Sequence, residues 1–132
     1  MIVPAQAVRV VIATRPVDFR KGHDGLAALA PSELGLDPHS GAVVVFRSKR
    51  GDRIKVLVWD DEEDQRAFQW KDRPTNGMVL VYKRLEGGKF AWPTIRDGVM
   101  RLSRAQFEAL FEGLDWRRVH GPRRVRPPRA AE

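Results

Sequence analysis

Two strand-like segments joined by a short basic turn constrain the fold more than any other feature of this sequence. Residues 42–47 are almost entirely apolar, as in a buried strand, and in residues 54–59 Ile54, Val56 and Val58 share one face. The intervening residues 48–52, Ser-Lys-Arg-Gly-Asp, have the composition of a hairpin connection with basic residues at its tip. The chain is therefore expected to build a sheet around this hairpin.

Further strands are predicted on both sides of the hairpin. Residues 8–14 are rich in β-branched residues, residues 78–85 form another apolar run, and residues 89–93 and 99–102 are shorter candidates. With a turn at Gly87-Gly88 between the later segments, most of these strands are expected to pair antiparallel to their neighbours.

Two helices are predicted between and after the strands. Asp24 is a suitable N-cap for a short helix that Pro31 should end or kink, because proline lacks an amide donor. Residues 103–106, Ser-Arg-Ala-Gln, form a capping box, and the helix behind it places four apolar side chains on one face: Phe107, Leu110, Phe111 and Leu114. The fold class is therefore α+β: a mainly antiparallel β-sheet with about two short helices packed on it.

The composition divides the chain into one domain and a tail. Residues 1–118 contain every predicted strand and helix, whereas residues 119–132 are rich in arginine and proline and have too few apolar residues to build a core. We expect the C-terminal segment to be a disordered, flexible basic tail.

The charge of the chain points towards a polyanionic partner. Lys and Arg number 24 against 17 Asp and Glu, a net charge of +7, which suits nucleic acid first and an anionic membrane surface second. No cysteine is present, which excludes disulfide frameworks, zinc ribbons and thiol nucleophiles. With no signal peptide and no apolar run long enough to cross a bilayer, a cytoplasmic protein without a membrane partner is expected.

Catalytic signals are weak. His23, His39 and His120 show no metal-ligand spacing. The acidic run 60–64 could hold Mg²⁺ in a nuclease-like site, but consecutive residues diverge, so a solvated acidic loop is favoured. No catalytic residue, metal site or cofactor is predicted, and the protein is not expected to be an enzyme.

Basic residues gather around the predicted hairpins and in the tail, where they could contact DNA phosphates. The candidate nucleic-acid-binding residues are Arg47, Lys49, Arg50, Arg53, Lys55, Lys83, Arg84, Lys89, Arg117, Arg118, Arg123, Arg124 and Arg126. Candidate stacking or partner contacts are Trp59, Tyr82 and Trp92, although packing within the domain is the commoner role of such residues. Sequence-specific readout has no support, because no known reading motif is present.

Several ordered blocks resemble one known family. They are residues 18–26 (Asp-Phe-Arg-Lys-Gly-His-Asp-Gly-Leu), residues 46–55 around the hairpin, Trp59-Asp60, residues 82–93 and residues 110–117. Together they are similar to the TnpB (Orf2-type) accessory proteins of the IS66 family of bacterial insertion sequences. The resemblance implies a bacterial mobile-element protein that supports transposition beside a separate transposase, and it implies no catalytic residue.

The chain departs from the family pattern at residues 61–75, and other roles than DNA binding are open for the protein and for some of its basic residues. Residues 61–75 look like an insertion at the tip of a hairpin, where extra length is well tolerated; the alternative is that this chain is a decayed, inactive copy. The protein could instead be an adapter for the transposase or another transposon-encoded protein, with Trp92, Trp116 or the insertion as contacts. Asp18 and Arg20 could form a pair that stabilises the strand-to-helix connection, a structural role that is favoured over DNA contact.

Overall fold

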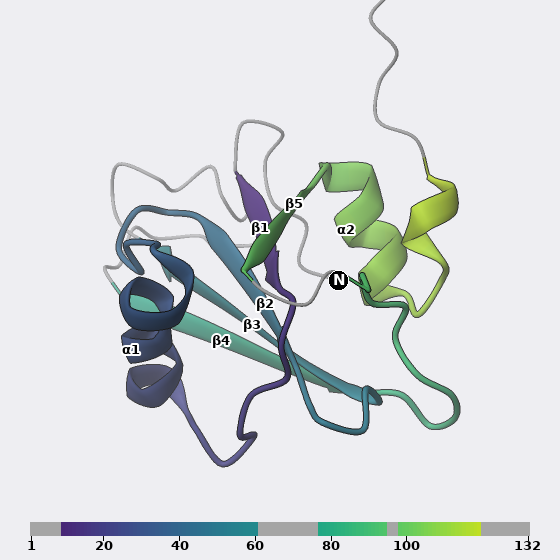
Figure 1. Ribbon diagram of the computed structural model, residues 1–132, viewed down its shortest axis with the longest axis horizontal. Coiled ribbons are helices and arrows are strands. Elements are labelled where there is room, and N and C mark those ends of the chain that lie inside the picture. Colours follow the sequence, from purple (N-terminus) through teal and green to yellow (C-terminus); the bar gives the residue numbers. More distant parts are fainter. Residues whose placement is uncertain (1–8, 61–76, 95–97, 120–132) are drawn as a thin grey trace, which may run out of the picture.

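The chain forms a five-stranded mixed sheet with one helix on each face (Figure 1). The computed structural model describes residues 9–60, 77–94 and 98–119. The strands are β1 (Val10–Ala13), β2 (Val43–Arg47), β3 (Arg53–Asp60), β4 (Gly77–Arg84) and β5 (Val99–Leu102), in the spatial order β4-β3-β2-β1-β5. Among the described strands only the β1–β2 pair is parallel, so the predicted α+β class with a mainly antiparallel sheet is confirmed.

The predicted β2–β3 hairpin is present. Val44 pairs with Leu57 and Arg47 pairs with Ile54, which leaves Ser48–Asp52 as the connection. The Gly51 amide donates to the Ser48 carbonyl at 3.0 Å, and Gly51 has a φ of +80°. A glycine suits this turn because a side chain is strained at such an angle.

Helix α1 (His23–Leu34) makes the crossover between the parallel strands β1 and β2. It begins after Gly22 rather than at the predicted cap Asp24, and it continues through Pro31, so Pro31 does not end the helix. A kink at Pro31 stays a prediction. Pro31 has no amide hydrogen, so the helix lacks the hydrogen bond that residue 31 would otherwise donate to the Ala27 carbonyl. The amides of Gly35 and Leu36 both donate to the Ala30 carbonyl and close the helix one turn later.

The sheet is buried on both faces, which explains why its central strands are apolar on both sides. Against α1, Leu26 packs with Val44, Phe46 and Leu57. On the opposite face, the helix α2 (Arg104–Phe111) packs over a second cluster: Ile12, Val45, Ile54, Val56, Phe107 and Leu110. Each such side chain contributes about 2 kcal/mol when fully buried.

The capping box at the start of α2 is confirmed. The Ser103 hydroxyl accepts from the Gln106 amide at 3.1 Å, and the Ser103 amide donates to Gln106 Oε1 at 2.9 Å. Leu114 does not share the buried face of the helix as predicted, because α2 ends at Phe111 and Leu114 is 61% exposed. The 3₁₀ turn η2 (Trp116–Arg118) follows.

The predicted strand at residues 89–93 is wrong. This segment has no strand pairing; it crosses the end of the hairpin, where the Phe90 amide donates to the Gly51 carbonyl at 2.8 Å and the Phe90 ring is buried. The proposed insertion at 61–75 and the tail beyond Val119 lie outside the described residues. Pairing of β3 with β4 extends to Asp60 opposite Gly77, next to the proposed insertion.

Candidate nucleic-acid interface

A basic cleft of about 530 Å³ lies beside the β2–β3 turn. Three segments form it: the connection after β1, the hairpin turn, and the segment that follows β4. Its described lining residues are Thr14, Arg15, Pro16, Arg47, Lys49, Arg50, Gly51, Lys89, Phe90, Trp92, Pro93 and Thr94. The crossing of the 89–93 segment over the hairpin therefore creates the cleft.

The cleft is strongly cationic. Arg15, Arg47, Lys49, Arg50 and Lys89 line it, and its described lining contains no carboxylate. Within residues 9–60, 77–94 and 98–119, no acidic group lies within ion-pair distance of Lys49, Arg50 or Lys89, all of which are exposed. Positive charge without a compensating neighbour in a concave site attracts anions.

Trp92 and Arg47 form one wall of the cleft. The Trp92 Nε1 donates to the Ala13 carbonyl at 2.9 Å, which fixes the indole, and the Arg47 Cζ lies 6.0 Å from the centre of the ring. The buried Arg47 Nε has no hydrogen-bond partner within the described part of the chain. The ring therefore holds the Arg47 guanidinium in place by a cation–π contact instead of an ion pair.

The hairpin turn and the segment after β4 are tied together by backbone hydrogen bonds. The Leu85 amide donates to the Asp52 carbonyl at 2.9 Å, and a Cβ at Gly51 would lie 3.7 Å from the Lys89 Cβ. These contacts bring Lys89 to the basic turn although the two are far apart in sequence.

Arg53 and Arg84 lie on the other side of the hairpin end. They are directly opposite one another in the β3–β4 register, on the face of the sheet that α1 covers. Arg53 Nε lies 3.9 Å from Asp52 Oδ1, and Arg84 is exposed. Neither residue lines the cleft.

Lys55 and Lys83 are placed where sequence reasoning did not expect them. Lys55 is only 7% exposed, and its ammonium donates to the carbonyls of Phe19 (2.7 Å) and Lys21 (2.8 Å). The Lys83 ammonium donates to the Phe111 carbonyl and lies 4.6 Å from the Phe111 ring centre. Both lysines hold separate segments against the sheet, so the structure does not bring them to the cleft.

Of the three aromatic candidates, only Trp92 lines the cleft. Trp59 is half-buried, with its ring 4.8 Å from the His39 ring. Tyr82 is 49% exposed and meets the Phe19 ring edge-on at 6.0 Å, with the Lys55 ammonium 5.5 Å from its own ring centre. Tyr82 therefore belongs to the same side of the sheet as Arg53 and Arg84.

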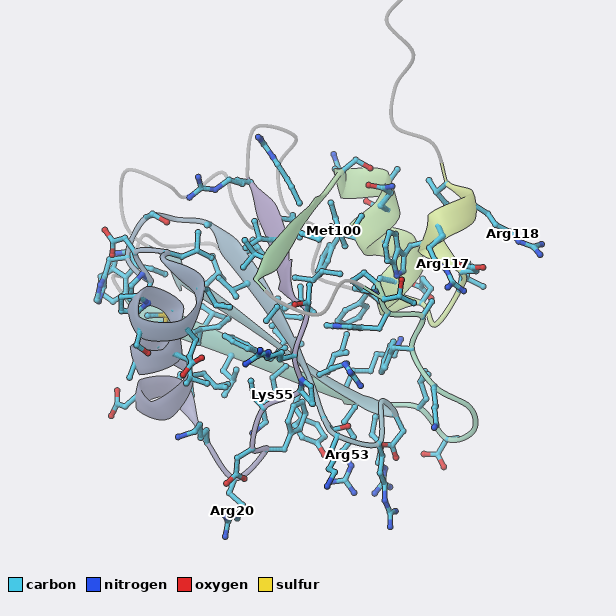
Figure 2. The ribbon with its side chains drawn as sticks, viewed as in Figure 1. Arg20, Arg53, Lys55, Met100, Arg117 and Arg118 are labelled. Carbon is cyan, nitrogen blue, oxygen red and sulfur yellow. The ribbon has the colours of Figure 1, made fainter. Side chains whose placement is uncertain are left out.

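The C-terminal arginines lie apart from the hairpin end. Figure 2 shows Arg53 low in the view and Arg117 and Arg118 at the upper right, beside η2. The Asp115 carboxylate accepts from Arg117 Nε at 2.8 Å and lies 3.8 Å from Arg118 Nε. The hydrogen bond from Arg117 lowers the pKa of Asp115. Three further predicted residues lie outside the described residues: Arg123, Arg124 and Arg126.

The predicted pair between Asp18 and Arg20 is confirmed. Both carboxylate oxygens of Asp18 accept from the Arg20 guanidinium, at 2.7 Å for the shortest contact, and this bonding lowers the pKa of Asp18. The pair stabilises the connection into α1.

Arg15 is the cleft residue that sequence analysis missed. It lies two residues beyond the end of β1, and the parallel pairing of β1 with β2 carries it to the same end of the sheet as Arg47. The sequence does place Arg15 at the end of a predicted strand. However, the parallel pairing of β1 with β2, which brings Arg15 and Arg47 to the same end of the sheet, was not predicted.

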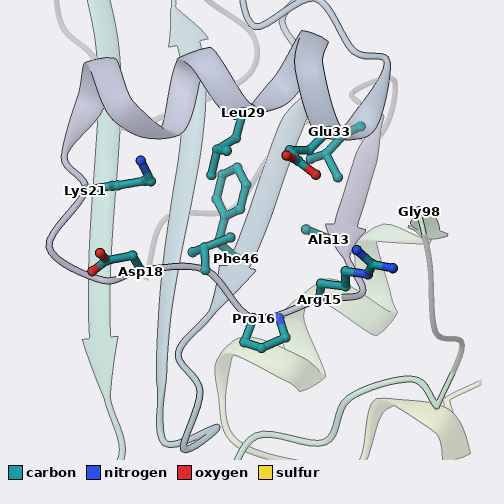
Figure 3. A pocket seen from close by; sticks show the side chains of 11 residues that line it. Ala13, Arg15, Pro16, Asp18, Lys21, Leu29, Glu33, Phe46 and Gly98 are labelled. Atoms are coloured by element: carbon teal, nitrogen blue, oxygen red, sulfur yellow. The ribbon is translucent and has the colours of Figure 1, made fainter.

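A second cavity, of about 390 Å³, lies between α1 and the connection after β1 (Figure 3). Leu29 and Phe46 form its apolar part, with Asp18 and Lys21 on one side and Glu33 and Arg15 on the other. Its charged lining residues balance one another, so this cavity lacks the one-sided charge of the basic cleft.

The described residues contain no group of three or more His, Asp or Glu side chains arranged to hold a metal ion. Among the same residues, no helix is long and apolar enough to cross a membrane.

The fold and the cleft define a small, basic α+β protein with a cationic site at one end of a mixed sheet. The chain belongs to the family of IS66 Orf2-like proteins (TnpB_IS66), whose model matches residues 8–121. Membership of this family implies an accessory protein of IS66 transposition. No solved structure matches the chain.

Two relatives come from Sinorhizobium fredii (strain NBRC 101917 / NGR234). The uncharacterized protein y4jC is 41% identical over 131 residues, which cover 99% of this chain and 100% of the relative. The uncharacterized protein y4hO is 37% identical over 117 residues, which cover 89% and 90% of the two chains. The similarity thus extends over the whole domain.

Proposed function

We propose that this protein supports IS66 transposition by binding DNA, with the basic cleft as its main contact to backbone phosphates. The observation that carries the proposal is the convergence of Arg47, Lys49, Arg50 and Lys89 from two separate segments, with no carboxylate in the described lining. Such an arrangement is unfavourable for the protein alone, because like charges repel, and it becomes favourable when phosphates lie between them.

The composition of the cleft favours contacts to the backbone over contacts to base edges. Lysine and arginine neutralise phosphates whatever the base sequence, and each contact releases a condensed counterion from the DNA. Binding should therefore be strong at low salt and weaken steeply as salt is added.

The test is fluorescence anisotropy with labelled transposon-end DNA and a scrambled duplex across a salt series. The triple variant Lys49→Ser, Arg50→Ser, Lys89→Ser should bind more weakly than the original protein. The slope of log affinity against log salt should fall by about 0.9 for each phosphate contact that is removed.

The control is the double variant Arg117→Ser, Arg118→Ser, which removes two exposed cations at the Asp115 turn, so the effects of the two variants are compared per cation removed. It should change affinity much less than the cleft variant. Equal effects of the two variants would show that net charge, and not the cleft, determines binding.

The proposed role requires no catalysis by this chain. Incubation of the purified protein with supercoiled and linear DNA in the presence of Mg²⁺ should leave both intact. Cleavage that is lost on addition of a chelator would contradict this part of the proposal.

A second candidate function, an adapter for the transposase, is favoured by the cavity next to α1. The half-buried Leu29 in its apolar part, with charges of both signs around it, suits a polypeptide better than a phosphate backbone. Co-purification with the transposase after nuclease treatment, lost in the variant Leu29→Glu, would support this role. Of the earlier candidate contacts, Trp116 is buried and unsuited to it.

A further inference from the structure

We infer that the hairpin end of the sheet is a ridge that binds duplex DNA, with cations on both of its faces contacting the phosphates of both strands. The ridge consists of the turn Ser48–Asp52 together with the adjoining residues of β2, β3 and β4. The inference rests on the proposed function and adds to it the form of the nucleic acid and a second contact surface.

The second surface is the cross-strand pair Arg53 and Arg84. Directly opposite residues of an antiparallel pair have their Cβ atoms about 5 Å apart, and like charges in this position are destabilising. Among the described residues, Asp52 is the sole carboxylate within ion-pair distance of either arginine, at 3.9 Å from Arg53 Nε. An anion placed between the two guanidinium groups would relieve the repulsion.

The two sets of cations lie on opposite faces of the same sheet end. Arg53 shares its face with Lys55, whose ammonium reaches the connection into α1, and Arg84 shares it with Tyr82. Arg47 shares the other face with Val45, which packs in the cluster under α2, and its guanidinium lies against Trp92. The strands β2 and β3 therefore separate the basic cleft from the arginine pair.

A duplex fits this arrangement better than a single strand does. Side chains on the two faces of a strand point in opposite directions, and layers packed on a sheet lie about 10 Å from it. The phosphates of a single strand follow one line, whereas the two backbones of a duplex flank a major groove about 12 Å wide that accepts a two-stranded ribbon. Lys49 and Arg50, exposed in the turn, would then lie at the mouth of the groove and reach the phosphates that border it.

The experiment compares a labelled duplex of about 21 base pairs, roughly two helical turns, with a single strand of equal length. The variant Arg53→Ser, Arg84→Ser should lower the salt slope for the duplex by about 1.8 and leave the slope for the single strand unchanged. A double cleft variant, Lys49→Ser, Lys89→Ser, removes the same number of cations and should weaken binding to both the duplex and the single strand. Arg101→Ser, an exposed arginine on β5 far from the hairpin, is the matched control and should change neither.

Arg53 is partly buried, so thermal melting must show that each variant is folded. Arg84 is exposed, and the single variant Arg84→Ser should give about half of the change in the salt slope for the duplex. The ridge inference is overturned if the variant Arg53→Ser, Arg84→Ser has the same salt slope for the duplex as Arg101→Ser. It is also overturned if that variant lowers the slope equally for the duplex and for the single strand. If the original protein shows no salt-dependent binding to either probe, the proposed function itself fails. If the cleft variant weakens DNA binding while substitution of Arg53 and Arg84 does not, the ridge inference fails and the proposed function stands.

Discussion

The hairpin end and the Asp115 turn both carry cations but arrange them differently. At the turn, Asp115 accepts hydrogen bonds from the backbone and side chain of Arg117 and lies near Arg118. At the hairpin end, Arg47, Lys49, Arg50 and Lys89 line one cleft with no carboxylate in its described lining. The comparison teaches that a carboxylate partner distinguishes cations already neutralised within the chain from cations left available to an anionic partner.

The largest effect should come from Trp116, which fixes the Asp115 turn to the domain. Its side chain is 3% exposed, and its Nε1 donates to the Ala91 carbonyl at 2.7 Å. Trp116→Ala should lower the free energy of unfolding by about 3–5 kcal/mol, measured by urea denaturation, because it leaves a cavity and an unpaired carbonyl. An unchanged stability would mean that the turn is not part of the packed domain.

The next effect should come from Lys55, a cation with a structural role close to the proposed interface. Lys55→Met keeps the length of the side chain but leaves the Phe19 and Lys21 carbonyls without their donor. We expect a loss of about 1–3 kcal/mol of unfolding free energy, with DNA affinity unchanged in the folded protein. Lys49→Met should do the opposite: stability within about 0.5 kcal/mol of the original, and weaker DNA binding.

A smaller effect is expected when the Asp115 turn is made to resemble the hairpin end. Asp115→Asn removes the carboxylate that pairs with Arg117 and Arg118. If pairing is what keeps these arginines from DNA, the variant should bind more tightly at low salt, with a salt slope steeper by about 0.9 for each additional phosphate that the arginines neutralise. An unchanged slope in the anisotropy titration would show that the position of the turn, and not pairing, excludes it.

The smallest effect concerns acid stability. Arg117 lowers the pKa of Asp115, and Arg20 lowers that of Asp18, so both carboxyls favour the folded state when ionised. The stabilisation is complete above the unfolded pKa of about 3.9 and is lost as the pH falls below it. Both groups are exposed, so the gain is small. The melting temperature of Asp18→Asn, Asp115→Asn should fall less steeply than that of the original protein between neutral pH and acid.

Local sequence patterns predicted the parts of the structure that depend on neighbouring residues. The capping box needs only Ser103 and Gln106, three positions apart, and the Asp18–Arg20 pair needs only two residues in one connection. The hairpin followed from two strand-like segments around a glycine-containing turn. In each case the interacting residues are close together in the sequence, so the local sequence is enough to predict the contact.

The features that were missed depend on contacts between distant segments. Lys55 lies on the strand face that the sequence alternation predicts. Its ammonium is enclosed because the connection into α1 lies over it, and the position of that connection could not be read from the strand alone. Residues 89–93 have the composition of a strand but cross the hairpin, because the turn at Gly51 supplies the hydrogen bond that a neighbouring strand would have supplied. The cleft itself arises from this crossing and from the parallel β1–β2 register.

The position of β1 has a consequence for how the chain acquires its structure during synthesis. The first strand is flanked by β2 on one side and by β5 on the other, and Val10 pairs with Leu102. One edge of β1 must therefore wait for nearly the whole domain to leave the ribosome, and closing so long a loop slows folding. A nascent or truncated chain that lacks β5 exposes this edge to strand pairing with other chains, which makes premature termination a route to aggregation.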